Sequence, residues 1–187
     1  MTVRLPRSDA WDNRGRILDA ACVVFVAGGP DVPMREIARR AQVGPATVYR
    51  HFPTKQMLLA AVFAEQSRAW RAALDDGLAD PDPWRGLRLA VSRLCELQAC
   101  DLGFSTAFKS AFPRAVDFAG LRASSLMSAA ALLGRAKDTE HVRADVSLDD
   151  LLLMLMASNG IRASNPTARI AASRRYAKLA IQAICTA

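Results

Sequence analysis

The sequence contains few of the residues that build metal sites, disulfide frameworks and active sites. Its 187 residues include two histidines, His51 and His141, and four cysteines, none of them in a Cys-x-x-Cys pair. Because metal sites and disulfide frameworks depend on sets of closely spaced ligands, we expect neither a metal nor a cofactor. The cysteines lie in apolar helical patterns typical of buried free thiols, although the closest pair, Cys95 and Cys100, leaves a redox role open.

No segment has the composition of a membrane anchor or a leader peptide. The apolar runs fall short of the roughly 20 residues that span a membrane, and the N-terminus MTVRLPRSDAWD has no apolar stretch before a cleavage site. We therefore expect a cytoplasmic protein without membrane contacts. A Gly-rich phosphate loop is also missing, and a Ser-His-acid set would have to use one of the two histidines, so the sequence predicts that the protein is not an enzyme.

Strand-like alternation and internal repeats are missing too, whereas apolar residues recur at helical spacing along the chain. With 51% hydrophobic residues the chain can fold rather than remain disordered. We predict an all-α fold, with a flexible arm over residues 1–12. About nine helices are expected, near residues 14–27, 34–41, 45–52, 55–76, 83–99, 103–112, 116–137, 148–157 and 166–184.

Positive charge is concentrated in the N-terminal part. The formal net charge is +7 and the isoelectric point about 9.8. Residues 1–55 hold nine Lys and Arg against five Asp and Glu, which leaves only +3 for the other 132 residues. A basic surface of this kind suits a polyanionic partner such as DNA.

The most informative stretch is 34–55, MREIARRAQVGPATVYRHFPTK. Its first part predicts a short helix with apolar residues at i, i+3, i+4 and i+7. A turn over 42–44 follows, in which Gly44 can take a positive φ. Pro45 suits the first position of a second helix. Two short helices joined by a tight turn form a helix-turn-helix, whose second helix enters the major groove of DNA.

The second helix has an inner and an outer face. Val48 and Phe52 lie four residues apart and should face inward, which leaves Thr47, Arg50 and His51 outward. Pro53 ends the helix because it lacks a backbone donor. Thr54 can then cap a third helix that begins at Lys55.

The segments REIA at 35–38 and TVYRHFPTK at 47–55 resemble the tetracycline-repressor (TetR) family of bacterial transcription regulators. The resemblance covers roughly residues 14–62. Pro33 stands where the family often has a capping Ser or Thr, and Gln42 where it often has Gly. The resemblance implies that Pro45 and Thr47 meet base edges, that Tyr49, His51 and Lys55 hold phosphates, and that Arg35 lies at the groove edge. The predicted DNA contacts are Arg35, Pro45, Ala46, Thr47, Tyr49, Arg50, His51, Thr54 and Lys55.

We predict two domains, a DNA-binding domain over 1–54 and an effector-binding and dimerisation domain over 55–187. The resemblance implies that bulky apolar residues of the middle helices line a cavity for a small, mostly apolar effector. Ordinary core packing is the alternative for each of them. The predicted ligand-binding residues are Phe63, Trp70, Trp84, Leu94, Gln98, Phe104, Phe108, Phe112, Phe118 and Met127.

The segment Leu151–Ala157 is apolar nearly all round, so both of its sides must be covered. The last helix is a candidate neighbour. Together the two could pair with the same helices of a second copy as a four-helix bundle. The resemblance also implies such a homodimer, while burial within one chain is the alternative. Two heads about one DNA turn apart, or a multiple of it, would read a palindrome.

The sequence therefore predicts a ligand-responsive transcription regulator that binds double-stranded DNA. A repressor released from a palindromic operator by a small apolar effector is the primary hypothesis. The alternative is a helix-turn-helix factor that activates transcription or binds DNA constitutively, without an effector.

Overall fold

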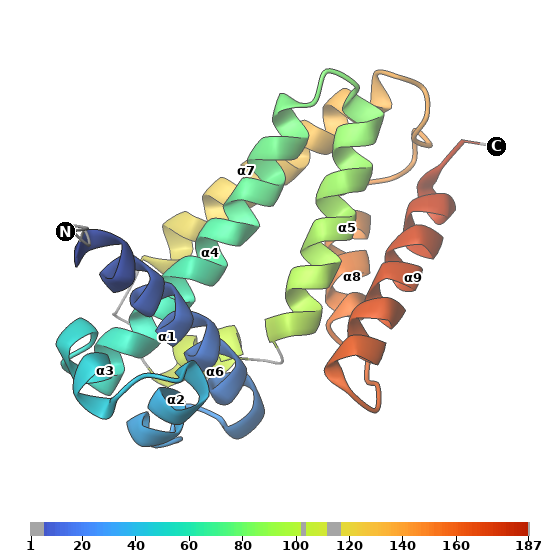
Figure 1. Ribbon diagram of the computed structural model, residues 1–187. Coiled ribbons are helices and arrows are strands. Elements are labelled where there is room, and N and C mark those ends of the chain that lie inside the picture. Colours follow the sequence, from blue (N-terminus) through green and yellow to red (C-terminus); the bar gives the residue numbers. More distant parts are fainter. Residues whose placement is uncertain (1–5, 102–103, 112–116, 187) are drawn as a thin grey trace, which may run out of the picture. The chain divides into compact units, whose positions relative to one another are not determined.

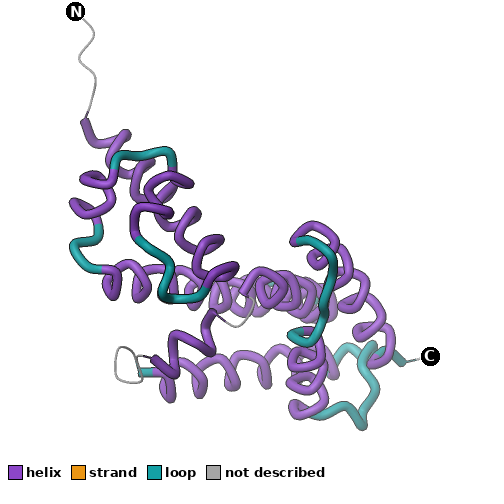
Figure 2. Tube along the Cα trace, turned by 90° about the horizontal axis from the view of Figure 1, so that it is seen from below, coloured by secondary structure: helices purple, strands orange, loops and turns teal. Residues whose placement is uncertain are grey.

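The computed structural model describes residues 6–101, 104–111 and 117–186, and within them the predicted all-α fold is confirmed (Figure 1). Apart from an isolated bridge between Val142 and Cys185, the regular structure of these residues is helical (Figure 2). The nine helices of this part are α1 Pro6–Gly28, α2 Met34–Ala41, α3 Pro45–His51, α4 Lys55–Ala79, α5 Pro83–Asp101, α6 Phe104–Ala111, α7 Phe118–Lys137, α8 Leu148–Ser158 and α9 Pro166–Ile184.

The first helix is longer than the sequence predicted. The flexible arm expected over residues 1–12 is wrong from Pro6 onward, because α1 begins there. The fixed φ of proline suits the first position of a helix. The remaining helices begin and end within three residues of their predicted bounds.

The chain forms two compact units. The first, here called the head, is Met1–Glu65 with Gly103–Ala115, and the second, here called the body, is Gln66–Leu102 with Val116–Ala187. Helix α6 therefore belongs to the head, although α5 precedes it in the sequence. The predicted boundary after residue 54, which separates a DNA-binding domain from an effector-binding and dimerisation domain, stays a prediction.

Aromatic side chains bring α6 into the head. Phe104 stacks on Phe25 of α1 with ring centroids 6.0 Å apart, and Phe108 stacks on Phe63 of α4 at 4.8 Å. All four rings are buried. Offset aromatic pairs add about 0.5–1.5 kcal/mol each to the free energy of burial, so these contacts stabilise the association of α6 with α1 and α4.

The body is built around α5, which packs against α7, α8 and α9. Leu151 and Leu155 of α8 are buried there, whereas Leu153 and Met156 on the opposite side are exposed by 64% and 71%. The start of α8 is a capping box: Ser147 Oγ accepts from the Asp150 amide at 3.1 Å, and Asp150 Oδ2 accepts from the Ser147 amide at 2.7 Å.

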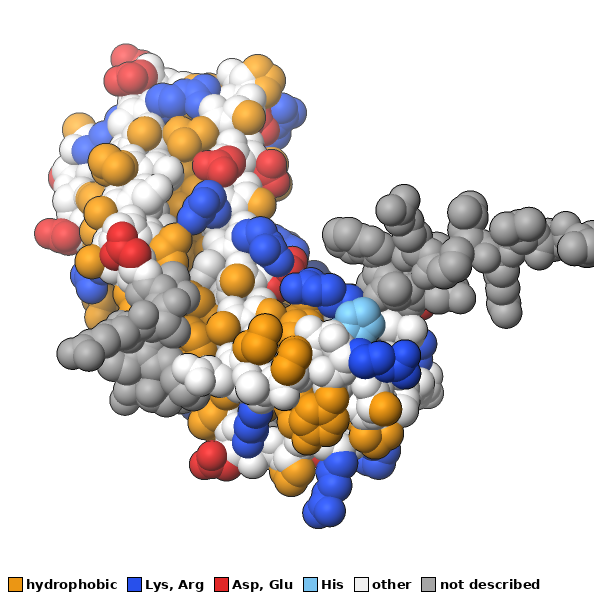
Figure 3. Space-filling view, turned by 90° about the vertical axis from the view of Figure 1, so that its left-hand side faces the viewer, with side chains coloured by type: hydrophobic (Ala, Val, Ile, Leu, Met, Phe, Trp, Pro, Cys, Tyr) orange, Lys and Arg blue, Asp and Glu red, His pale blue; other side chains and the backbone are white. Residues whose placement is uncertain are grey.

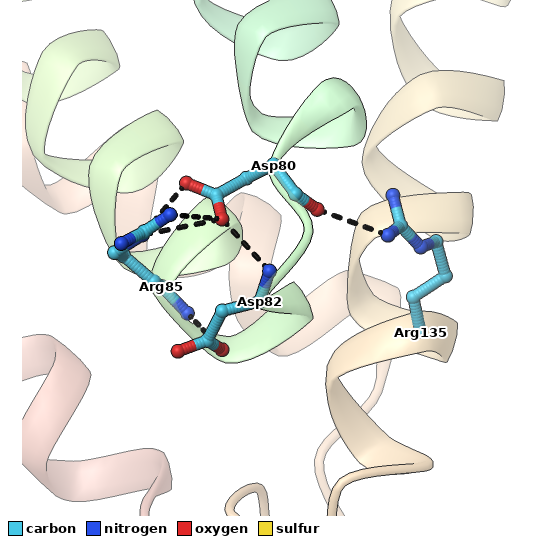
Figure 4. A network of polar contacts seen from close by, with 4 residues as sticks. All are labelled: Asp80, Asp82, Arg85 and Arg135. Atoms are coloured by element: carbon cyan, nitrogen blue, oxygen red, sulfur yellow. Dashed lines mark hydrogen bonds and ion pairs between the residues drawn. The ribbon is translucent and has the colours of Figure 1, made fainter.

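A polar network holds the connection between α4 and α5 (Figure 4). The Asp80 carboxylate accepts hydrogen bonds from Arg85 Nε at 2.9 Å and from the Asp82 amide at 2.9 Å. The hydrogen bonds from Arg85 lower the pKa of Asp80. Arg135 of α7 donates to the carbonyl oxygens of Leu78 and, at 3.1 Å, of Asp80. The network therefore fixes the end of α4 to α7 within the body.

The turn of the helix-turn-helix differs from the prediction in one residue. The positive φ expected at Gly44 lies at Gln42, with φ 55°, while Gly44 has φ −66°. Gln42 is the C-cap of α2, and its amide donates back to the carbonyls of Ala38 and Arg39. This closure needs a left-handed residue. Gly44 is instead the N-cap of α3, a position that takes an extended backbone.

We expect Gln42→Gly to raise the free energy of unfolding by about 1 kcal/mol, because glycine enters the left-handed region without the steric cost that a Cβ brings. Thermal denaturation should show a rise in Tm of about 2–4 °C for a chain of this size. Gly44→Ala is the matched control and should give no gain. If Gly44→Ala cost more than about 1 kcal/mol and Gln42→Gly changed nothing, the strain would lie at Gly44 instead.

Candidate nucleic-acid interface

The short helix α3 has one anchored face and one free face. Val48 is fully buried and Phe52 nearly so, which confirms that these two side chains face inward. The side chain of Tyr49 is 52% exposed, Arg50 is exposed, and Thr47 is half-buried. The side chains of Thr47 and Tyr49 therefore remain accessible on the described surface of the head.

Both ends of α3 follow from the local sequence. Pro45 occupies its first turn behind the N-cap Gly44. After Pro53, Thr54 Oγ1 accepts a hydrogen bond from the Met57 amide at 3.2 Å, so the predicted cap of the next helix is confirmed. The first residue of that helix, Lys55, is half-buried.

The helix-turn-helix also carries exposed cations on α2. Arg35 and Arg40 are exposed and make no ion pair with a described residue, whereas Arg39 donates through Nε to Glu36 Oε2 at 3.0 Å. The hydrogen bond from Arg39 lowers the pKa of Glu36. Figure 3 shows one face of the molecule, on which Lys and Arg side chains (blue) lie with apolar groups and some acidic ones between them. The surface is suited to a polyanion.

Known proteins share both the motif and the fold. The family model described as "Bacterial regulatory proteins, tetR family" matches residues 17–62, which include α2 and α3. The HTH-type transcriptional repressor KstR of Mycolicibacterium smegmatis is 31% identical over 157 residues, which cover 77% of each chain. A TetR transcription regulatory protein from Mycobacterium vanbaalenii is 32% identical, with a TM-score of 0.69 over 96% of this chain and 99% of that one.

The chain belongs to the TetR family. The TetR regulator SCO0520 of Streptomyces coelicolor, 26% identical with a TM-score of 0.70, covers 92% of this chain and 98% of its own. The Pseudomonas putida protein TtgW, named an uncharacterised HTH-type transcriptional regulator, is 36% identical over 47% of this chain. That match spans 66% of TtgW, just under two thirds of its length. These relatives carry the names of regulators rather than enzymes.

Three of the residues predicted to bind an effector lie in the head of this TetR-family protein. Phe63, Phe104 and Phe108 are buried in the aromatic stack described above. The head also contains a shallow cavity of about 210 Å³. None of the predicted effector-binding residues lines it; its lining residues are Arg14, Gly15, Leu18, Asp19 and Glu65.

The other described members of that set lie in the body. Trp84 stacks on His141 with ring centroids 6.2 Å apart, and the guanidinium of Arg88 lies over the Trp84 ring, 5.4 Å from its centroid. Gln98 Oε1 accepts a hydrogen bond from Ser158 Oγ at 2.8 Å. Leu94 is buried, Trp70 and Phe118 are half-buried, and Met127 is exposed by 68%. Phe112 lies outside the described residues.

The sulfur and metal chemistry of the described chain is limited. Cys95 is buried, and desolvation raises the pKa of its thiol, whereas Cys100 is exposed. The described residues contain no cluster of three or more metal-ligating side chains. None of the described helices is both long enough and apolar enough to cross a membrane.

Sequence patterns did not single out two arginines of α1 that support the motif. The guanidinium of Arg14 lies over the ring of Phe52, 5.4 Å from its centroid. Arg16 Nη2 donates to the carbonyl oxygens of Ala41 at 2.7 Å and of Gln42 at 3.2 Å. These partners are at least 25 residues away in the chain, so no local spacing could indicate them.

Proposed function

We propose that this TetR-family protein is a repressor that binds a palindromic operator as a homodimer and is released by a small, mostly apolar effector. The observation that carries the DNA-binding part is the free face of α3, with Thr47 and Tyr49 accessible between exposed cations. A cylinder of this size fits the major groove and reaches the phosphates on both sides. The repressor names of several relatives support repression over activation.

Each residue of this face has a proposed role. Pro45, Ala46 and Thr47 open α3 and face base edges, where methyl groups and a hydroxyl can read thymine methyls and polar edges. The phenol of Tyr49, the imidazole of His51 and the ammonium of Lys55 hold phosphates. Arg35 and Arg50 lie at the groove edge. Thr54 accepts from a backbone amide, which leaves its own O–H free to donate to a phosphate.

The homodimer would form through α8 and α9. Leu153 and Met156 of α8 and Leu179 of α9 are large apolar side chains that stay exposed in the single chain. Pairing these two helices with their counterparts in a second copy would remove that surface from water and give a two-fold interface. Two heads would then meet two half-sites of a palindrome.

The effector would occupy the body, where Trp70, Leu94 and Phe118 supply apolar surface and Gln98 a polar group. Binding to one of two conformations of the dimer would weaken DNA affinity by a coupling free energy of typically 1–3 kcal/mol. A regulator of this kind works in the cytoplasm, beside the chromosome. A thermal-shift screen against apolar small molecules tests this part: if no compound stabilises the protein and none releases DNA, the constitutive alternative holds.

The DNA-binding part is tested by Tyr49→Phe combined with Lys55→Ala. Loss of two phosphate contacts should weaken binding about 30- to 100-fold at about 150 mM salt. The slope of log K against log salt should become shallower by about 0.9 for the lost cationic contact. The measurement is fluorescence anisotropy on a duplex that the parent protein has enriched from a random-sequence library.

Arg39→Ala removes the same charge from a residue already paired with Glu36, and serves as the control that leaves binding nearly unchanged. All three proteins should share one Tm within about 2 °C, because these side chains are exposed or half-buried. If the double variant and the parent bound the duplex with equal affinity, Tyr49 and Lys55 would not be DNA contacts.

A further inference from the structure

The side chain of Arg16 links α1 to the turn between α2 and α3. Its Nη2 donates to the carbonyl oxygens of Ala41 at 2.7 Å and Gln42 at 3.2 Å, and its Nη1 approaches Asn13 Oδ1 at 3.5 Å. Ala41 is the last residue of α2, and Gln42 is its left-handed cap. The guanidinium therefore binds the two carbonyl groups at which the chain leaves α2.

These carbonyl groups need a donor from outside their own helix. The last four carbonyls of an α-helix have no intrahelical partner, and a cation near them also interacts favourably with the helix dipole. The amides of Gln42 and Val43 turn back to Ala38 and Arg39, which closes α2 but leaves the carbonyls of Ala41 and Gln42 open. Arg16 supplies both missing donors from another helix.

The turn in question sets the direction of α3. Only Gln42, Val43 and Gly44 separate α2 from Pro45, and Gln42 holds a backbone conformation that costs a non-glycine residue about 1–2 kcal/mol. A change in its ψ angle would redirect every residue that follows. Base readout depends on donors and acceptors placed within hydrogen-bond distance, so a small rotation of α3 would lose sequence-specific contacts first.

We propose that Arg16 is a positioning residue for DNA recognition: it fixes the angle between α2 and α3 by binding the Ala41 and Gln42 carbonyls and does not contact DNA itself. This inference rests on the proposed DNA-binding function. Both N–H groups of Nη2 are directed to protein acceptors, and Nη1 lies beside Asn13. Three of the five N–H groups of the guanidinium therefore face protein acceptors, which favours a role within the head over a phosphate contact.

The test uses the full chain with Arg16→Met, which keeps the apolar stem, and Arg16→Lys, which keeps the charge and can donate to one carbonyl. Arg39→Met is the charge-matched control. We expect Arg16→Met to lose about tenfold in affinity for the enriched duplex and less than about threefold for a scrambled one, with Arg16→Lys between it and the parent. The salt slope should be unchanged, because no phosphate contact is lost.

Hydrogen exchange gives a second readout that needs no DNA. The Val43 amide hydrogen-bonds to the Ala38 carbonyl at the end of α2, and the amides of Thr47 and Val48 bond to the Gly44 carbonyl at the start of α3. Their exchange should accelerate about tenfold in Arg16→Met and remain at the parental rate in Arg39→Met. If the methionine variant does not fold, the lysine variant carries both measurements.

Two results would overturn the inference. Equal losses on both duplexes, with a salt slope reduced by about one unit, would make Arg16 a phosphate contact. If Arg16→Met lowered the Tm but left amide exchange at the turn and the ratio of affinities for the two duplexes unchanged, Arg16 would only stabilise the fold. If the parent protein enriches no duplex at all, the proposed function fails, while exchange at Val43, Thr47 and Val48 still decides whether Arg16 holds the turn.

Discussion

Gly86→Ala should lower the free energy of unfolding by about 3–5 kcal/mol, enough to unfold a marginally stable domain. A Cβ at Gly86 would lie 2.2 Å from the carbonyl oxygen of Gly77 and 3.1 Å from the Cβ of Asp80. The nearest atom belongs to the backbone of α4, so no change of rotamer can relieve the clash. Helices α4 and α5 would have to separate where the Asp80 network of Figure 4 joins them.

Urea denaturation followed by circular dichroism measures this effect, and Gly134→Ala provides the control. Gly134 lies within α7, and an added Cβ there meets no atom within 4 Å. Alanine at such a position should stabilise the protein by about 0.5–1 kcal/mol, because glycine loses more backbone entropy in a helix. Similar midpoints for Gly86→Ala and the parent would show that α4 and α5 do not approach as closely as described.

Leu153→Glu combined with Met156→Glu should convert the proposed dimer into a monomer. Both side chains are exposed in the single chain, so the substitutions cost its own folding little. In a paired interface they would bury two carboxylates without partners, at several kcal/mol each. Affinity for a palindromic duplex should fall at least about 100-fold, because a single head retains only one half-site.

Sedimentation equilibrium and anisotropy on the same samples test this prediction. Leu89→Glu is the matched control, since Leu89 is a leucine of the body exposed by 57% on α5. It should leave both the mass and the DNA affinity unchanged. If the dimer persisted in the α8 variant but dissociated in Leu89→Glu, the interface would be formed by α5 rather than by α8 and α9.

The elements that the sequence predicted well are those with local signals. Pro45 marks the start of α3 because it has no backbone N–H to donate. Thr54 marks the start of α4 because its side chain accepts a hydrogen bond from a backbone amide of the first turn. Spacing alone put Val48 and Phe52 on the buried face. The start of α1 was missed because residues 1–12 carry no apolar periodicity, although a helix can extend from Pro6 without it.

The turn shows where local reasoning fails. Glycine is the usual left-handed residue, so the sequence pointed to Gly44, yet the positive φ lies at Gln42. Which of two nearby residues takes that conformation depends on where α2 closes and α3 starts, and on the donors that hold the open carbonyls. One of these donors is Arg16, which reaches the turn from another helix.

The sequence by itself determined the all-helical fold, the helix-turn-helix and the free face of α3, because these follow from helix periodicity and from residues at helix ends. Only the tertiary structure decided that Phe104 and Phe108 join the head and that Gly77 and Gly86 bring two helices into close contact. The physical reason is that an apolar or small residue type indicates burial but does not indicate which helix covers it. The neighbouring helix is determined by how whole helices pack against one another in the tertiary structure.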